Sequence, residues 1–292
     1  MSELLKSYQK KIDQVLAEEV SSFGPDSPAK KGCEYSLLNG GKRFRPIITL
    51  MVADALNLGA DVMQAALATE YFHTASLVAD DLPCMDDDDE RRQKPSLHKI
   101  YGEALSLLVT YALIAEGYSN YTKNAASLKT ANLAHSPLSD RICTLTIETA
   151  TYNTGLNGAT GGQLLDIMPP DLSLETVKQV IHKKTSSLFE IAFVSGWLFG
   201  GGQIRKLDLV KDAAAHYGLA FQIADDIGDQ EQDLKNGRKI NVANLFGIEA
   251  ATKMIESEVA AYKETVSKLN IATPPLEEIA TSLLIGSQTC QN

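Results

Sequence analysis

Apolar side chains recur at helical spacing along most of this 292-residue chain, and this periodicity is the strongest constraint on its fold. Near the start, one expected buried face follows the three- and four-residue spacing of a helix, with Leu5, Tyr8, Ile12, Val15 and Leu16. The alternation typical of strands is nearly absent, and only short breaks containing Gly, Pro or Asn separate the helical segments. The sequence therefore predicts an all-α chain.

Longer helical segments follow the first one. Asp61 and Gln64 have the spacing of a capping box, which predicts a helix that begins here and runs to Asp80. Further helices are expected at 104–122, 141–151, 173–200, 208–229 and 250–269. Residues 104–118 are apolar on most faces, which predicts a position at the centre of a bundle. Because no linker, repeat or low-complexity segment interrupts the pattern, residues 1–292 are expected to form a single domain.

Composition and charge exclude several classes of protein. The net charge is −10 and no long basic run is present, so nucleic acid is not an expected partner. The longest apolar stretch, residues 191–202, is shorter than the ~20 residues that a membrane span needs and is expected to be a buried core helix. The start of the chain lacks the apolar region of a signal peptide. Four cysteines lie far apart, at Cys33, Cys84, Cys143 and Cys290, which favours a cytoplasmic protein. The short apolar stretch predicts that the protein has no stable membrane insertion.

The densest chemistry lies between Asp80 and Glu90, where six aspartates and one glutamate occur within eleven residues. Oxygen ligands in such number are what Mg²⁺ requires, together with water and substrate phosphate oxygens. Most acidic runs are solvated loops. Here, however, Asp80 and Asp81 end an apolar helix, and Arg91 and Arg92 follow at once. Because arginine is well suited to phosphate, the segment predicts metal-assisted binding of a phosphate group.

A second acidic cluster ends another apolar helix. Asp225 and Asp229 are four residues apart and share one helix face with Gln222, and Asp226 lies beside them. One such DDxxD pattern is a weak signal. Two acidic clusters at the ends of two apolar helices are a stronger one, and they predict two walls of one cavity that face each other across bridging metal ions.

Basic residues that could hold an anion occur at three further places. Lys42, Arg43 and Arg45 surround an expected helix start, where free N–H groups and the helix dipole also favour anions. Lys183 and Lys184 precede Thr185, and Arg238 precedes Lys239. Each of these groups taken alone is more often a solvated surface charge.

Taken together, these motifs resemble the trans-prenyltransferase (polyprenyl diphosphate synthase) family, which includes farnesyl and geranylgeranyl diphosphate synthases. The likeness covers about residues 40–247 and is carried by GGKRFRP, DDLPCMDDDDERR, GGQLLD, HKKTSSL and GLAFQIADDIGD. The resemblance implies an all-α isoprenoid-synthase fold, a single-domain helical bundle with a central cavity. It also implies a homodimer and three Mg²⁺ ions bound with the diphosphate.

The resemblance further implies roles for individual residues. The expected metal ligands are Asp80, Asp81, Asp86, Asp225, Asp226 and Asp229. The expected contacts of the allylic diphosphate are Arg91, Lys184, Thr185, Gln222 and Lys239. The expected contacts of isopentenyl diphosphate are Lys42, Arg45, His73 and Arg92. The residues expected to take part directly in catalysis are Asp80, Asp81, Asp86, Arg91, Lys184 and Asp225.

The implied reaction joins isopentenyl diphosphate to geranyl or farnesyl diphosphate. Metal ions and basic side chains would stabilise the charge on the departing diphosphate, so that the allylic C–O bond ionises. The double bond of isopentenyl diphosphate then attacks the carbocation, and a proton is lost. A closed, dry cavity would keep water away from the cation.

The length of the product is expected to depend on the helix that carries Asp80. Phe72, Ser76 and Asp80 are four residues apart and form a column that descends ~5.4 Å per turn. One turn below the aspartates the residues are small, Ala75 and Ser76, so nothing there stops a growing chain early. This favours a twenty-carbon product with Phe72 as a lower stop, and a fifteen-carbon product stays open.

The chain departs from the family pattern at several positions. Ala79, Thr110-Tyr111 and Gln93 stand where the family usually has His, Gly-Asp and Gly, and the segment after the second acidic motif is shortened. One alternative is a non-catalytic subunit of a heteromeric synthase, although such subunits typically lose aspartates that this chain keeps. A terpene cyclase would have no use for GGKRFRP, and a purely structural bundle would leave both acidic clusters unexplained.

Overall fold

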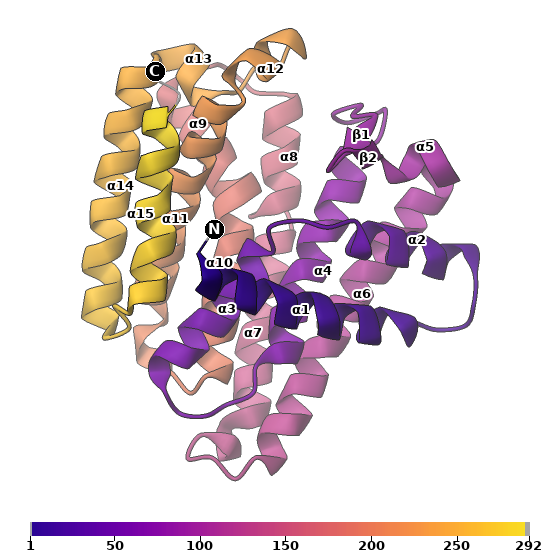
Figure 1. Cartoon of the computed structure of the whole chain (residues 1–292), viewed down its shortest axis with the longest axis vertical. Helices are drawn as coiled ribbons and strands as arrows, with labels where there is room; N and C mark the ends of the chain where they lie inside the picture. Colours follow the sequence, from indigo (N-terminus) through magenta and orange to yellow (C-terminus); the bar gives the residue numbers. More distant parts are fainter. Residues whose placement is uncertain (1, 290–292) are drawn as a thin grey trace. The chain divides into compact units, whose positions relative to one another are not determined.

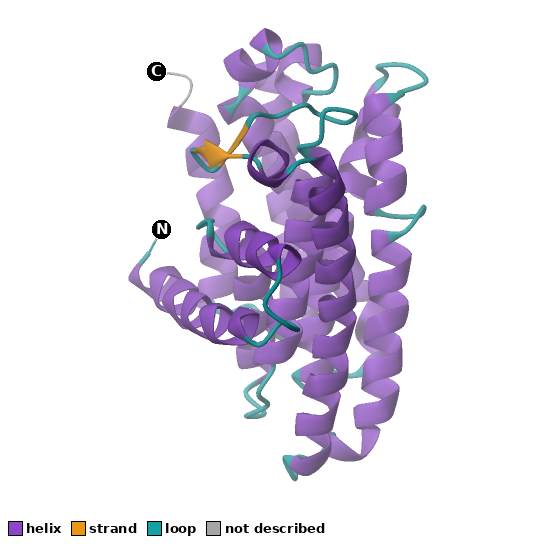
Figure 2. Ribbon diagram, turned by 90° about the vertical axis from the view of Figure 1, so that its right-hand side faces the viewer, coloured by secondary structure: helices purple, strands orange, loops and turns teal. Residues whose placement is uncertain are grey.

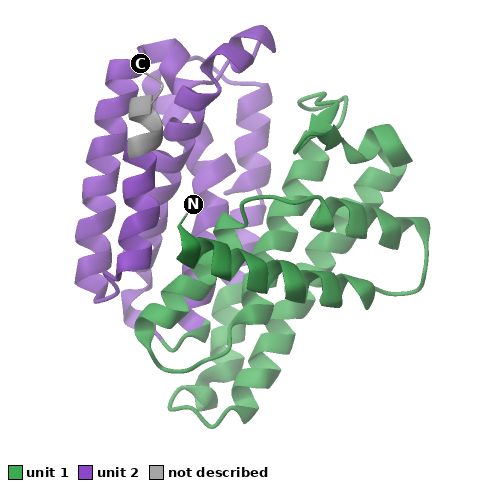
Figure 3. Ribbon diagram, in the orientation of Figure 1, with its two compact units in different colours: residues 1–147, 199–201 green, residues 148–198, 202–292 purple. Residues whose placement is uncertain are grey.

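The computed structural model describes residues 2–289, and nearly all regular structure in this range is helical (Figure 2). The strands described there are β1 (Glu90–Arg91) and β2 (Lys94–Pro95), which pair antiparallel. The all-α prediction is therefore confirmed. By the density of contacts, the chain forms two compact units, residues 1–147 with 199–201 and residues 148–198 with 202–292 (Figure 3).

The first unit is built around α4, which packs along α6 and against α3 (Figure 1). Buried alanines at Ala65, Ala66, Ala68 and Ala75 keep α4 thin, so its neighbours approach closely. The helices of this unit are α1 (Glu3–Ser21), α2 (Pro28–Leu38), α3 (Phe44–Leu56), α4 (Met63–Asp80), α5 (Leu97–Tyr101), α6 (Glu103–Thr130) and the start of α7 (Ser139–Thr154), with a short 3₁₀ turn at Ser136–Leu138.

The start of α4 is held differently from the prediction. Asp61 Oδ1 accepts a hydrogen bond from Met63 N at 3.0 Å, but Gln64 turns away and donates to Glu19 at 3.0 Å, so no capping box forms. The free N–H of Ala65 instead donates to Asn124 Oδ1 on α6 at 2.9 Å. A side chain distant in sequence therefore satisfies one of the helix-end donors.

The helix predicted at 104–122 is longer, and one of its faces is exposed. Leu107, Leu108 and Tyr111 on α6 are 40, 56 and 63% exposed, so the prediction that this segment lies wholly inside a bundle is wrong. The opposite face, with Val109 and Leu113, is fully buried. The segment is thus apolar on two faces. The face with Val109 and Leu113 packs inside the first unit, and the face with Leu108 and Tyr111 is exposed.

The second unit is centred on α11, which packs along α14. Buried aromatic side chains of Phe189, Phe193, Tyr217 and Tyr262 form a cluster with ring centroids 5.0–6.1 Å apart. The elements of this unit are the end of α7, α8 (Ala159–Ile167), α9 (Leu174–Ile181), a π-helical turn (His182–Ser186), α10 (Ser187–Phe199), a 3₁₀ turn (Ile204–Lys206), α11 (Leu207–Gly228), α12 (Gln230–Lys235), α13 (Val242–Phe246), α14 (Ile248–Leu269) and α15 (Pro274–Thr289).

The apolar stretch at 191–202 lies mostly in α10, where residues 191–199 are buried as predicted. The predicted helix at 173–200 is three consecutive segments, because a wider π turn separates α9 from α10. In the described part of the chain, no helix combines the length and the apolar character that a membrane crossing requires.

Candidate active site

The first acidic segment begins at the last residue of α4 and folds back on it. The backbone N–H of Asp86 donates to the carbonyl oxygen of Asp80 at 2.9 Å, so the loop returns to the helix end after six residues. Asp80 and Asp86 are partly exposed, whereas Asp81 is only 3% exposed. The structure thus brings the three predicted ligands of this segment together at one helix end.

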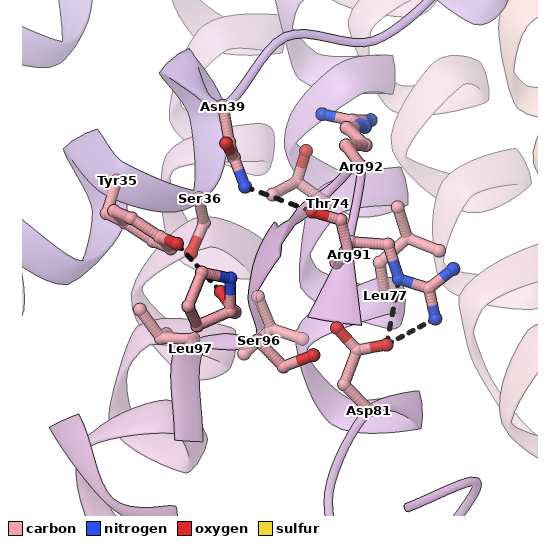
Figure 4. A pocket seen from close by; sticks show the side chains of 12 residues that line it. Tyr35, Ser36, Asn39, Thr74, Leu77, Asp81, Arg91, Arg92, Ser96 and Leu97 are labelled. Carbon is pink, nitrogen blue, oxygen red and sulfur yellow. Dashed lines mark hydrogen bonds and ion pairs between the residues drawn. The ribbon is translucent and has the colours of Figure 1, made fainter. Parts of the chain in front are cut away.

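Arg91 is held beside these aspartates by two carboxylates. Its Nε donates to Asp81 Oδ1 at 2.9 Å, and its Nη2 pairs with Asp88 Oδ2 at 3.0 Å. Figure 4 shows the guanidinium beside the Asp81 carboxylate, bonded to one of its oxygens. Burial raises the pKa of Asp81 above its ordinary value, although the bonds from Arg91 oppose that shift. Arg91 is therefore fixed in position with its charge close to the end of α4.

Arg92 lies in the tight turn that joins β1 to β2. Arg92 and Gln93 have φ of 56° and 63°, the left-handed pair that a two-residue hairpin turn of type I′ requires. The Arg92 guanidinium donates to the carbonyl oxygen of Gly40. A Cβ at Gly41 would lie 2.6 Å from Arg92 Cζ, so the glycine is needed for this approach. The turn thereby brings Arg92 to the GGKRFRP segment, as the family resemblance implies.

Arg43 and Glu70 form a buried ion pair behind this arrangement. Glu70 is 1% exposed and accepts from Arg43 Nη1 at 2.5 Å, and Arg43 also bonds Asp13 and the carbonyl of Leu37. Glu70 Oε1 lies 3.8 Å from Arg92 Nη2. Arg43 is thus occupied inside the unit and is not available to an anion. We did not predict Glu70, although a single glutamate within an apolar helix was a usable signal.

His73 lies on α4 among several arginines. Burial lowers the pKa of His73 well below its ordinary value, and the charges of Arg45 and Arg92 lower it further. Its Nδ1 has no hydrogen-bond partner among the described residues. Arg45 is 8% exposed, while Lys42 is exposed with its ammonium 5.9 Å from the Phe44 ring. His73, Arg45 and Arg92 are therefore close enough to interact, and His73 is neutral at neutral pH. They are three of the four residues expected to bind isopentenyl diphosphate.

In the second unit, Lys184 belongs to the π turn and pairs with Asp166 of α8, with Nζ and Oδ2 2.5 Å apart. A Cβ at Gly162 would lie 2.3 Å from the backbone N of Lys184, so only glycine lets α8 approach the turn this closely. GGQLLD and HKKTSSL thus form one structural element. Asp166 was not among the predicted site residues, and its partner could not be read from the sequence.

A chain of hydrogen bonds runs from the π turn to the second acidic cluster. Thr185 Oγ1 donates to Gln222 Oε1 at 2.7 Å, and Gln222 Nε2 donates to Asp226 Oδ1 at 2.9 Å. Asp226 Oδ2 accepts from the backbone N of Val242 at 2.8 Å. Burial raises the pKa of Asp226 to about 6. The structure therefore brings Thr185, Gln222 and Asp226 together, with Asp226 buried inside the unit.

Asp225 and Asp229 lie at the same helix end but are exposed. The backbone N of Asp229 donates to Asp225 O at 2.8 Å, which keeps them one turn apart on α11. Lys239 is also exposed, in the segment between α12 and α13. The Nε atom of its neighbour Arg238 lies 3.5 Å from Asp233 Oδ1. Asn241, which we did not predict, donates to both Asp226 O and Asp233 at 2.8 Å and fixes this segment to α11.

The residues at both helix ends fit a divalent cation of the Mg²⁺ type. Asp80, Asp86, Asp225 and Asp229 are all at least partly exposed, so their carboxylate oxygens can reach a ligand. Hard oxygen donors of this kind suit Mg²⁺. Asp226 differs, because both of its carboxylate oxygens already accept hydrogen bonds within the protein.

Comparison with known proteins gives a consistent picture. Residues 27–245 match the family described as polyprenyl synthetase. Geranylgeranyl pyrophosphate synthase 4 of Arabidopsis thaliana is 32% identical over 262 residues, which cover 84% of this chain and 67% of that protein. Farnesyl diphosphate synthase of Bacillus subtilis is 28% identical over 292 residues, with 96% of each chain covered.

The fold is also similar to that of solved structures. The apo crystal structure of an FPP/GFPP synthase from Zymomonas mobilis superposes with a TM-score of 0.80 at 27% identity, covering 97% of this chain and 100% of the other. The similarity in sequence and in fold therefore extends over nearly the whole chain.

Proposed function

Since the chain belongs to the polyprenyl synthetase family, we propose that it is a short-chain prenyl diphosphate synthase, which condenses isopentenyl diphosphate with geranyl or farnesyl diphosphate. One observation carries the proposal. A carboxylate holds a basic side chain near each acidic cluster. Asp81 holds Arg91, and Asp166 holds Lys184 in the π turn, whose Thr185 bonds Gln222 on α11. A diphosphate needs both metal ligands and direct cationic donors, and the chain supplies both in each unit.

We assign the roles as follows. Mg²⁺ binding is assigned to Asp80, Asp81 and Asp86 in the first unit and to Asp225 and Asp229 in the second, with Asp226 behind the latter pair. When bound, Mg²⁺ supplies positive charge that stabilises the departing diphosphate. The number of ions implied by the resemblance is three. Because Asp226 is buried and bonded to Val242, its part is to orient the cluster rather than to offer an open oxygen.

The proposed contacts of the allylic diphosphate are Arg91, Lys184, Thr185, Gln222 and Lys239. Support for Gln222 comes from its fixed amide, whose oxygen accepts from Thr185 and whose nitrogen donates to Asp226. The single domain expected from the sequence stays a prediction.

Isopentenyl diphosphate is bound by Lys42, Arg45, His73 and Arg92. The low pKa of His73 supports this role, because a neutral imidazole among arginines contributes a hydrogen bond without adding to the charge repulsion there. The two diphosphates are thus held by different basic residues. The donor of the allylic diphosphate, Arg91, is adjacent to Arg92 in the same hairpin.

A homodimer is proposed from the exposed face of α6. Leu107, Leu108 and Tyr111 form an apolar face on a helix whose other side is buried, and such faces commonly mark a protein interface. Leu108→Glu is expected to shift the chain toward a monomer in light scattering. An unchanged molar mass in Leu108→Glu would rule out this face as the dimer interface.

The cytoplasmic location stays a prediction. The free thiols of Cys33, Cys84 and Cys143 are consistent with it. Cys290 lies outside the described residues.

The deciding experiment is incubation of the purified chain alone with Mg²⁺, isotope-labelled isopentenyl diphosphate, and either geranyl or farnesyl diphosphate. Mass analysis is expected to show a product five carbons longer than the primer, and Asp225→Asn is expected to abolish it. A chain that forms no product alone but restores activity to a second subunit would instead be the non-catalytic partner.

A further inference from the structure

Asp87, Asp89 and His98 form a second cluster of metal-binding side chains, apart from the aspartates assigned above. One ligand atom of each residue lies within 4.8 Å of those of the other two. The backbone holds the two segments together, because Ser96 N donates to the carbonyl oxygen of Asp89 at 2.9 Å. Asp87 has a left-handed backbone, with φ of 52°, and is anchored by its N–H to Leu82 O at 3.1 Å.

His98 is the feature that points to a ligand. It is only 8% exposed, yet neither of its ring nitrogens has a hydrogen-bond partner among the described residues. A buried polar atom without a partner is unfavourable, because it has lost its hydrogen bonds to water. Asp87 and Asp89 are exposed, so their side chains can turn toward the imidazole at little cost. A cation between the three groups would bind one nitrogen of His98.

We propose that Asp87, Asp89 and His98 bind a divalent transition metal, with Zn²⁺ as the best match. Zn²⁺ binds both His nitrogen and Asp oxygen, and a site with three protein ligands leaves its fourth position to water. Mg²⁺ prefers oxygen ligands throughout and is disfavoured here. In the structure the three ligand atoms lie within 4.8 Å of one another. At zinc bond lengths they would lie ~3.3 Å apart, so the exposed aspartates must rotate to bring their oxygens closer.

Lys99 opposes the metal. Its Nζ lies 2.5 Å from Asp89 Oδ1, and its charge occupies the position next to the proposed site. Metal binding must therefore displace this ammonium or use the second oxygen of Asp89. Removing the charge of Lys99 is expected to tighten the binding of the metal.

The metal would join the acidic loop to the start of α5. The hairpin of β1 and β2, which carries Arg91 and Arg92, lies between these two points in the sequence. Asp88, which pairs with Arg91, is flanked by the two aspartate ligands. Binding at this site would fix the loop that positions Arg91, without placing the metal on the substrate.

The proposal is tested by titrating Zn²⁺ into the full-length protein in excess Mg²⁺, in competition with a chromogenic chelator. One Zn²⁺ per chain is expected. His98→Gln and Asp87→Asn should each weaken this binding at least about tenfold. Glu90→Gln removes an exposed charge next to Asp89, at the start of β1, and should leave binding unchanged. Lys99→Met should tighten binding severalfold.

X-ray absorption at the zinc edge supplies a second measurement. The wild-type spectrum is expected to show an imidazole ligand. In His98→Gln this signal should be absent. In Asp87→Asn it should be lost only to the extent that zinc leaves the site. Should His98→Gln fail to fold by circular dichroism, Asp87→Asn decides, because Asp87 is exposed. Equal zinc affinity in the wild-type protein and Asp87→Asn, or a zinc spectrum without imidazole, would overturn the proposal.

Discussion

The backbone N–H of Asp86 donates a 2.9 Å hydrogen bond to the carbonyl oxygen of Asp80. The first and the last aspartate of the DDLPCMD segment are thereby neighbours, although five residues separate them in the sequence. Because this bond joins backbone atoms, neither carboxylate takes part in it.

Asp86→Asn tests the metal role of this segment. The substitution keeps the side-chain shape and removes the negative charge, so we expect kcat/KM to fall about 10²- to 10³-fold, as for loss of one strong electrostatic group. The Mg²⁺ concentration needed for half-maximal rate should rise. Glu90→Gln, the control, should retain full activity. Full activity in Asp86→Asn would remove Asp86 from the proposed ligands.

Gln93→Gly tests the hairpin turn. Gln93 has φ of 63°, a left-handed conformation that costs a side-chain-bearing residue ~1–2 kcal/mol, whereas glycine adopts it freely. After the entropy cost of glycine is subtracted, a gain of about 0.5–1 kcal/mol in the free energy of unfolding is expected by denaturant titration. Gln93→Ala is the control and should give no gain. A destabilised Gln93→Gly protein would contradict the turn assignment.

Gly162→Ala tests the contact between α8 and the π turn. The new Cβ would lie 2.3 Å from the backbone N of Lys184, and a backbone atom gives way only if the turn moves. We expect a loss of about 1–3 kcal/mol in the free energy of unfolding. The allylic substrate should also bind more weakly, because Lys184 moves. Gly228→Ala, with nothing within 4 Å, is the matched control for stability.

Phe72→Ala tests the lower stop for the growing chain. The Phe72 ring is 2% exposed and fills the space over Gly117, where a Cβ would lie 2.7 Å from the ring. Its removal opens a cavity between α4 and α6, and we expect products longer than the wild-type product by chromatography. The cost in stability is about 3–5 kcal/mol.

Because Phe72→Ala could unfold the protein, Phe72→Leu is the milder variant and should shift the products partially. Phe193→Leu replaces a fully buried aromatic residue of the second unit and controls for general loosening. The same product distribution in Phe72→Leu and in the wild-type protein would refute the role of Phe72.

The pair of His216 on α11 and Glu258 on α14 predicts a pH dependence of stability. Their side chains lie 2.6 Å apart, and the hydrogen bond to Glu258 raises the pKa of His216 above its ordinary value. The folded state therefore holds this proton more tightly than the unfolded chain does. The contribution is complete below the unfolded pKa of about 6.5 and is lost as the pH rises through the higher folded pKa.

His216→Gln should accordingly reduce the free energy of unfolding more at about pH 6 than at about pH 9. Since His216 is partly exposed, the difference is expected to stay below about 1 kcal/mol. Denaturant titrations at both pH values measure it. An equal effect at the two pH values would show that the pair contributes no proton-linked stability.

Local patterns predicted most of the elements. The helix that ends at Asp80 and the helices near 208–229 and 250–269 match α4, α11 and α14 within two residues at each end. They could be predicted because helical periodicity depends on neighbours three and four residues away. The π turn could not, since HKKTSS has no pattern that distinguishes five residues of π-helix from α-helix.

The sequence alone determined the fold class and which residue types stand at the ends of α4 and α11. Both follow from spacings within one helix and from short motifs. The tertiary structure decided which partner each charged group has. Lys184 pairs with Asp166 from 18 residues away, Thr185 bonds Gln222 from 37, and Arg43 is held by Glu70 from 27. Such partners are brought together by helix packing, which no local spacing encodes.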